Sequence, residues 1–308
     1  MMKETDRRQE DPHPSIPMSG KIAASECHCF EKRTHGRKVT NDEEETTTTE
    51  EDSGLWELSF LFEADLPSRR ERFHFETDAG KRLEIVLDSA DDEPGALQSG
   101  QYLWPASQVL AKYFVQTYAR AAPSLVVELG AGCGLCACTA WQLWSNSLHC
   151  LVVTDRDPGA LERARNNHET TLEELLDQNS ETEDALNATI NNLGSTPTFF
   201  ETLEWGNTHD TQIVQDMMAE YSLPTQRHTD FVLGSDLIYD ISVVEPLLQT
   251  VLILLTGGAN GRFLLAQSFV FDPSTEEEID RCCAEFGLAR RSVYEDASHS
   301  RIQEFQLA

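Results

Sequence analysis

The sequence predicts an α/β fold with a Rossmann-like, doubly wound sheet that is mostly parallel. From about residue 123 onward, short hydrophobic runs typical of buried strands alternate with stretches of helical periodicity. A glycine-rich turn follows the first of these runs, at the position where a doubly wound sheet binds a nucleotide. The last two runs have no helix between them, so we expect an antiparallel hairpin at one sheet edge.

The elements are expected in a simple order along the chain. Alternating runs WELSFLF, RFHFE and RLEIVLD predict leading strands or a hairpin, and a helix is expected to start at Pro105 or Ser107. Helices are then expected over residues 134–144, from 158 onward, over 243–255 and over 275–286. The expected core strands are LVVEL, LHCLVVT, PTFFETL, DFVLGSDLIY, GRFLLAQSF, residues 289–294 and IQEFQL.

The composition changes along the chain and predicts a tail followed by one domain. Residues 1–53 are polar, with an acidic run and a Thr tract, and cannot bury enough apolar surface to fold alone. We therefore expect a disordered tail at 1–53 and an ordered domain at 54–308, with leading strands and a helix at 54–122 and the cofactor-binding core at 123–308. The acidic stretch at about 168–193 is longer than an α/β connection needs and predicts an insertion.

The charge of the chain restricts its partners. A formal net charge of −29 repels phosphate backbones and anionic lipid, because binding to either depends on clustered Lys and Arg. We expect no nucleic-acid or membrane partner, and a basic protein partner is favoured. No long apolar stretch or signal peptide is evident, so we expect a soluble monomer in the cytoplasm, with the nucleus as an alternative.

The stretch ELGAGCGLCAC mixes glycines with cysteines and could serve a nucleotide or a metal. We interpret Cys136 and Cys138 as helix-packing residues, and Cys133 as a thiol in the turn itself, beside a cofactor. In the tail, the spacing of Cys27, His28, Cys29 and His35 does not suit zinc, so no metal site is predicted.

The glycine turn and the next strand predict a cofactor site. Gly130 and Gly132 allow a close approach of the backbone, and the start of the following helix offers amide hydrogens. Asp155 ends the next strand, about twenty residues on, where a carboxylate can accept both hydroxyls of a ribose. The same spacing suits a nicotinamide cofactor, so an oxidoreductase remains an alternative here.

The stretch VLGSDLIYD places Ser235, Asp236 and Tyr239 at the end of another hydrophobic strand. A buried parallel strand rarely ends in a carboxylate and a phenol unless these face a cleft. We therefore expect them at the same sheet edge as the glycine turn.

Four stretches together resemble the seven-strand S-adenosylmethionine methyltransferases of the protein-lysine type, the methyltransferase-like 21 group. They are GQYLWPASQVLAKYF, VVELGAGCGL, LEWG and GSDLIYD, and their order fits between residue 100 and the end of the chain. The resemblance implies a seven-stranded sheet, with S-adenosylmethionine bound against Trp104, Gly130, Ala131, Gly132, Asp155, Trp205 and Ser235. It also implies that Asp236 and Tyr239 are catalytic.

The implied reaction is direct methyl transfer to a lysine amine of a protein that carries a basic or lysine-bearing surface. Asp236 would orient the amine and Tyr239 would hydrogen-bond nearby. Alternatives are a histidine, arginine, small-molecule or nucleic-acid acceptor, and an interaction protein that binds the cofactor without turnover. The acidic balance disfavours nucleic acid, and retention of Asp155, Asp236 and Tyr239 disfavours the interaction protein.

Overall fold

The computed structural model describes residues 68–91, 100–178, 196–222, 229–256 and 260–308, which all fall within one compact unit. The predicted tail at 1–53, the strand WELSFLF and most of the predicted insertion lie outside these residues. In the described part of the chain, no helix combines the length and the apolar character needed to cross a bilayer.

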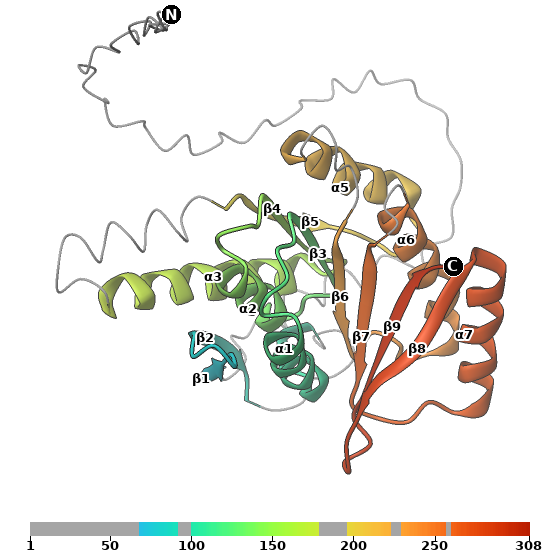
Figure 1. Cartoon of the computed structure of the whole chain (residues 1–308), viewed down its shortest axis with the longest axis horizontal. Helices are drawn as coiled ribbons and strands as arrows, with labels where there is room; N and C mark the ends of the chain where they lie inside the picture. The colour runs from blue at the N-terminus through green and yellow to red at the C-terminus, as the bar shows by residue number, and fades with distance from the viewer. Residues whose placement is uncertain (1–67, 92–99, 179–195, 223–228, 257–259) are drawn as a thin grey trace, which may run out of the picture. The chain divides into compact units, whose positions relative to one another are not determined.

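The described chain forms a two-stranded hairpin followed by a seven-stranded sheet with helices on both faces (Figure 1). In chain order, the elements are β1 (Ser68–Glu76), β2 (Arg82–Ala90), α1 (Pro105–Thr117), β3 (Leu125–Leu129), α2 (Leu135–Leu143), β4 (Cys150–Asp155), α3 (Pro158–Gln178), β5 (Thr198–Thr202), α5 (Thr208–Tyr221), β6 (Phe231–Ser235), a short 3-10 helix (Ile241–Val243), α6 (Val244–Leu255), β7 (Arg262–Gln267), α7 (Pro273–Phe286), β8 (Leu288–Glu295) and β9 (Arg301–Leu307).

The predicted fold class is confirmed. The sheet order is β5-β4-β3-β6-β7-β9-β8, with parallel pairing from β5 to β7 and antiparallel pairing of β9 with both of its neighbours. The predicted C-terminal hairpin therefore forms the sheet edge, with β8 outermost. The order reverses at β3, so the crevice expected in a doubly wound fold opens beside the end of that strand.

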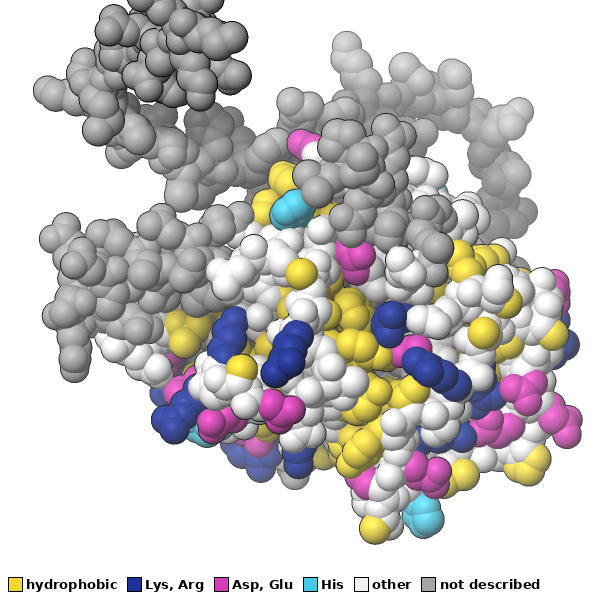
Figure 2. Space-filling model, viewed as in Figure 1, with side chains coloured by type: hydrophobic (Ala, Val, Ile, Leu, Met, Phe, Trp, Pro, Cys, Tyr) yellow, Lys and Arg dark blue, Asp and Glu magenta, His cyan; other side chains and the backbone are white. Residues whose placement is uncertain are grey.

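The core strands form from runs in which apolar residues predominate. Every residue of β3 is buried, as expected for a parallel strand covered on both faces. One face packs against α1, α2 and α3, and the other against α5, α6 and α7. On the face drawn in Figure 2, hydrophobic side chains gather over the region of α1, β6 and β7, with charged side chains of both signs around them.

The β1–β2 hairpin is held on the outside of α2 and α3 by side chains that pair with the free edge of β2. Thr171 Oγ1 accepts from Val86 N at 3.1 Å and donates to Val86 O at 2.9 Å. Asn167 and Gln142 bond the backbone of Asp88 and Glu84 in the same way. Helix side chains thus satisfy polar groups that another strand would otherwise pair.

Two elements differ from the sequence prediction. Helix α5 was not predicted; Asn207 caps it by accepting from the amides of His209 and Asp210. The strand expected over DFVLGSDLIY ends at Ser235, because Asp236 adopts a left-handed backbone with φ of 53°. That conformation turns the chain out of the sheet.

His168 lies within α3, in the part of the predicted insertion that continues the helix. Its ring packs 4.4 Å from that of Trp141, measured between centroids, and its Nε2 has no hydrogen-bond partner in the described part of the chain. Burial lowers the pKa of His168 to about 4.

We expect His168 to make stability fall in mild acid. Between pH 6.5, the usual pKa of histidine, and about pH 4, the unfolded chain binds a proton at His168 that the folded protein does not bind. The free energy of unfolding therefore decreases as the pH is lowered through this range. The loss is at most about 3 kcal/mol. Urea unfolding at a series of pH values measures it. The His168→Phe variant should lose less stability over that range, and equal losses in both proteins would contradict the assignment.

Candidate functional site

The candidate site lies at the edge of the sheet where the five parallel strands end. The structure gathers the predicted residues there from separate elements. Trp104 precedes α1, the glycine turn follows β3, and Asp155 ends β4. Trp205 follows β5, Ser235 ends β6 and Asp236 comes next.

The glycine turn between β3 and α2 requires glycine for two reasons. Gly130, Gly132 and Gly134 all have positive φ, of 57°, 53° and 79°, which strains any residue with a Cβ. A Cβ on Gly130 would also lie 2.6 Å from Cδ2 of Leu237, and one on Gly132 would lie 3.1 Å from the carbonyl oxygen of Gly100. The turn is therefore a place of close backbone approach, as predicted.

Asp155 faces the glycine turn. One of its carboxylate oxygens accepts from Gly132 N at 3.0 Å and the other from Asp157 N at 3.0 Å. Burial raises the pKa of Asp155, and these amides offset part of that effect. Asp157 caps α3 by accepting from Gly159 N at 2.9 Å, so the two aspartates make separate contacts.

The two predicted tryptophans have different surroundings. The half-buried ring of Trp205 approaches Gly130 so closely that a Cβ there would lie 3.2 Å from its Cζ2 atom. Trp104 is the N-cap residue of α1 and packs edge-on against Tyr102, with ring centroids 5.3 Å apart. One indole thus borders the turn, while the other belongs to the segment that crosses it.

Residues 100–104 cross the glycine turn and are fastened on both sides. Gln101 accepts from Arg163 of α3 at 3.0 Å, and its carbonyl accepts from the thiol of Cys133 at 3.3 Å. Cys133 is only 2% exposed, and burial raises its pKa to about 12. The thiol packs under this segment, and Cys136 and Cys138 are buried in α2 as predicted.

Asp236 ties three elements together. One carboxylate oxygen accepts from Ala106 N at the start of α1, at 3.1 Å. The other accepts from the amide and the hydroxyl of Ser268, beyond β7, at 2.7 and 2.9 Å. A carboxylate has about four acceptor positions, so one remains for a further donor. Burial raises the pKa of Asp236, and the hydrogen bonds from Ser268 and Ala106 act against that rise.

The structure leaves Tyr239 largely exposed. Its side chain is 64% exposed on the loop after β6. In the described part of the chain no hydrogen bond joins it to Asp236. Tyr239 therefore faces solvent on this loop.

Glu128 is a residue of this site that the sequence reasoning missed. It is 2% exposed in the middle of the apolar strand β3, and it accepts from Ala137 N, in the first turn of α2, at 2.8 Å. Burial raises its pKa to about 8, with a smaller contribution from the charge of Asp155. A carboxylate inside the otherwise apolar run LVVEL was the available signal.

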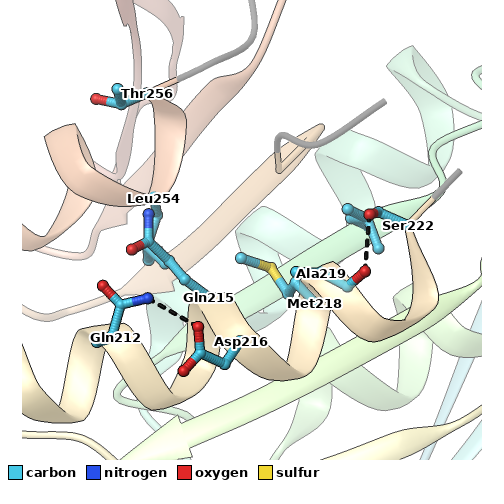
Figure 3. Close-up of a pocket in the computed structure, with 9 residues that line it drawn as sticks. Gln212, Gln215, Asp216, Met218, Ala219, Ser222, Leu254 and Thr256 are labelled. Atoms are coloured by element: carbon cyan, nitrogen blue, oxygen red, sulfur yellow. Dashed lines mark hydrogen bonds between the residues drawn. The ribbon is translucent and has the colours of Figure 1, made fainter. Parts of the chain in front are cut away.

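A separate hollow of about 190 Å³ lies at the opposite edge of the sheet (Figure 3). It is lined along α5 by Gln212, Gln215, Asp216 and Met218, and it includes Leu125, the first residue of β3. Because β3 starts here and ends at the glycine turn, this hollow is not continuous with the candidate site.

Comparison with known proteins supplies the family context. A family model described as lysine methyltransferase matches residues 84–268, which covers β2 to β7 and includes every predicted site residue. No curated protein has a sequence that matches the chain.

Solved structures of several methyltransferases are similar at low identity. The mitomycin 7-O-methyltransferase has 15% identity and a TM-score of 0.38, over 66% of this chain and 56% of that one. A putative RNA methyltransferase from Pyrococcus horikoshii has 14% identity and a TM-score of 0.42, over 72% and 91%. The magnesium protoporphyrin IX methyltransferase from Synechocystis, with bound S-adenosylmethionine, has 13% identity and a TM-score of 0.39, over 71% and 87%. Likenesses this weak say nothing about the substrate of this chain.

Proposed function

The chain belongs to the lysine methyltransferase family, and from that membership we propose that it transfers a methyl group from S-adenosylmethionine to a lysine side chain of a protein. The observation that carries the proposal is Asp236. This partly buried carboxylate keeps one acceptor position and lies at the sheet edge that also holds the glycine turn.

S-adenosylmethionine is the cofactor of this family, and the residues present fit it. The turn at Gly130 and Gly132 leaves no room for a Cβ, Asp155 offers a carboxylate suited to ribose hydroxyls, and Trp205 offers an indole face to an adenine. We assign Ala131, Ser235 and Trp104 to the same site. The nicotinamide alternative fails, because the family is one of methyltransferases.

When bound, the cofactor supplies an electrophilic methyl group on a sulfonium. A lysine amine attacks only when neutral, and its pKa in water is near 10.4. We assign to Asp236 the task of accepting an N–H of the incoming amine, which fixes the direction of its lone pair. The cofactor would supply its methyl carbon to the lysine nitrogen held by Asp236 and would keep the electron pair of the broken carbon–sulfur bond on sulfur. The excess proton on nitrogen leaves to solvent or through Asp236.

The test is methyl transfer with S-adenosylmethionine that carries a radioactive methyl group. The purified full chain is incubated with cell extract, beside an Asp236→Ala control, and the labelled proteins are hydrolysed to amino acids. Label in methyl-lysine that depends on Asp236 supports the proposal. Label in methyl-histidine, methyl-arginine, RNA or small molecules identifies one of the alternative acceptors instead. Cofactor binding without any transfer favours the interaction protein.

Cofactor affinity should depend on Asp155 and not on its neighbour Asp157. We expect Asp155→Ala to weaken S-adenosylmethionine binding by about 10- to 100-fold, because a charged hydrogen bond contributes about 1.5–3 kcal/mol. Isothermal titration calorimetry measures the change. Asp157→Ala is the matched control: it removes a helix cap and about 1 kcal/mol of stability, but it leaves the affinity unchanged. Equal losses in both variants would argue against a ribose contact at Asp155.

A further inference from the structure

Large hydrophobic side chains are exposed mainly on two loops beside the candidate site. Five such side chains are exposed in the described part of the chain, and four of them follow β6 or β7. Tyr239 is 64% exposed on the first loop, and Ile241, which starts the 3-10 helix at the end of that loop, is 43% exposed. Phe269 and Val270 are 42% and 64% exposed on the second loop. We call these four residues the rim patch. Exposed apolar residues that cluster in this way often mark an interaction surface, whereas exposed apolar residues that are scattered singly do not.

The two loops are joined by bonds that fix them relative to one another. Strands β6 and β7 are parallel neighbours, with Ser235 paired to Ala266, so both loops leave the same sheet edge. Gln267 Nε2 donates to the carbonyl of Ile238 at 3.2 Å, and Ser268 donates twice to Asp236. Phe269 also packs edge-on against Phe271, which is 6% exposed, with centroids 6.0 Å apart. These hydrogen bonds therefore hold the two loops of the rim patch together, next to the proposed acceptor carboxylate.

The charges in these loops are all negative. Neither residues 236–245 nor residues 267–278 contain Lys, Arg or His, whereas both contain several Asp and Glu. Asp240 and Asp272 are exposed and accept hydrogen bonds from the residues that follow them, which lower the pKa of both carboxyls and keep them ionised. Arg281 and Arg301, which approach from neighbouring elements, are already paired with Glu245, Glu278 and Glu276. No ion pair neutralises Asp240 or Asp272 in the described part of the chain, so each loop keeps a negative charge beside the apolar patch. This combination suits a cationic partner with an apolar side chain.

We propose that the rim patch docks the protein substrate by holding an apolar side chain next to the acceptor lysine, in a segment with further basic residues. This inference rests on the proposed function, because it takes the occupant of the neighbouring carboxylate to be a lysine. An RNA partner would meet uncompensated negative charge on both loops, so a protein segment is the occupant that the charges favour.

The experiment measures binding of short fluorescent peptides with a central lysine, in the presence of saturating S-adenosylhomocysteine. One peptide has leucine beside the lysine and arginine at its outer positions. A second replaces the leucines with serine, and a third replaces the arginines with glutamate. We expect the leucine–arginine peptide to bind about tenfold more tightly than either of the others, by fluorescence anisotropy.

Variants connect that preference to the patch. Phe269→Ser combined with Val270→Ser should weaken the leucine–arginine peptide about tenfold and leave the serine peptide and the cofactor affinity unchanged. Tyr294→Ser is the matched control, because Tyr294 is the fifth exposed large hydrophobic residue and lies on β8, outside the patch. Its peptide affinity should equal that of the unaltered protein.

Three results would overturn the docking proposal: equal or undetectable binding of all peptides, an equal effect of the Tyr294 control, or tighter binding of single-stranded polyuridine than of any peptide. The readout needs no turnover. Leucine-dependent binding without methyl transfer would contradict the proposed function alone, whereas lysine methylation that ignores Phe269 and Val270 would contradict the docking alone.

Discussion

The Asp236→Ala protein should transfer methyl groups about a thousandfold more slowly than the unaltered chain, while it keeps most of its affinity for S-adenosylmethionine. The predicted size is that of losing a positioned group that acts on the reacting atoms. The alanine also leaves the amide of Ala106 and both donors of Ser268 without their acceptor. We therefore expect a loss of stability of about 1–3 kcal/mol beside the loss of rate.

A second substitution separates these two effects. Ser268→Ala removes one donor to Asp236, the hydroxyl, and keeps the amide donor and the carboxylate. Its rate should fall by less than about tenfold if the carboxylate itself acts on the acceptor amine. Single-turnover kinetics at saturating cofactor, with melting curves for each protein, give both quantities. Rates that fall equally in the two variants would mean that Asp236 only positions the loop.

The second large effect concerns stability and lies far from the site, where Glu304 on β9 is buried. Its side chain is fully enclosed and accepts from Tyr118 at 2.6 Å, from Arg291 at 2.5 Å and from Arg262 at 3.3 Å. Burial alone would raise the pKa of Glu304, but the hydrogen bonds from Tyr118 and Arg291 outweigh it and hold the pKa below its usual value. Burial and the bond to Glu304 raise the pKa of Tyr118 to about 12.

We expect Glu304→Leu to lower the free energy of unfolding by about 3 kcal/mol, because it leaves Arg262 and the Tyr118 hydroxyl without a buried acceptor. For a domain of this size, the melting temperature should fall by roughly 6–12 °C. Glu285→Leu is the control: Glu285 pairs with Arg281 at the surface, with side-chain exposures of 56% and 45%, and should cost less than about 1 kcal/mol.

A double-mutant cycle with Tyr118→Phe tests the buried pair directly. If the two side chains stabilise one another, the double variant loses less stability than the sum of the single losses. Since the folded pKa of Glu304 is depressed, its contribution is present above the usual pKa near 4.5 and is lost as the pH falls through the folded value. Additive losses, or an effect unchanged in acid, would show that Glu304 contributes through packing alone.

The central strands of the sheet could be predicted from the sequence because apolar residues predominate in β3, β4, β6 and β7. The prediction failed for α5, where only Thr211, Val214 and Met218 are buried, so the apolar periodicity is too sparse to recognise. The N-cap at Asn207 was the usable signal. The left-handed backbone of Asp236 was also beyond reach, because the donors that hold it lie 130 residues before it and 32 residues after it.

The sequence indicated which residues belong to the candidate site better than it indicated how their side chains are placed. Asp155 contacts Gly132, and Trp205 borders Gly130, since parallel strands deliver their carboxyl ends to one edge. Glu128 was overlooked because an apolar strand conceals a single carboxylate from pattern reasoning. The exposure of Tyr239 could not be predicted from the motif, because short-range periodicity carries no information about the turn at Asp236 that precedes it.

The hydrogen bonds of Asp236 also constrain when the protein becomes active during folding. Its donors come from α1 and from the end of β7, so the carboxylate reaches its final surroundings only after sequence-distant segments have docked on both sides of β6. Contacts between segments distant in sequence form late in folding, because the chain loses conformational entropy before these contacts can stabilise the structure. A nascent chain that has not yet completed β7 would therefore lack the ordered carboxylate of Asp236, even with its glycine turn in place.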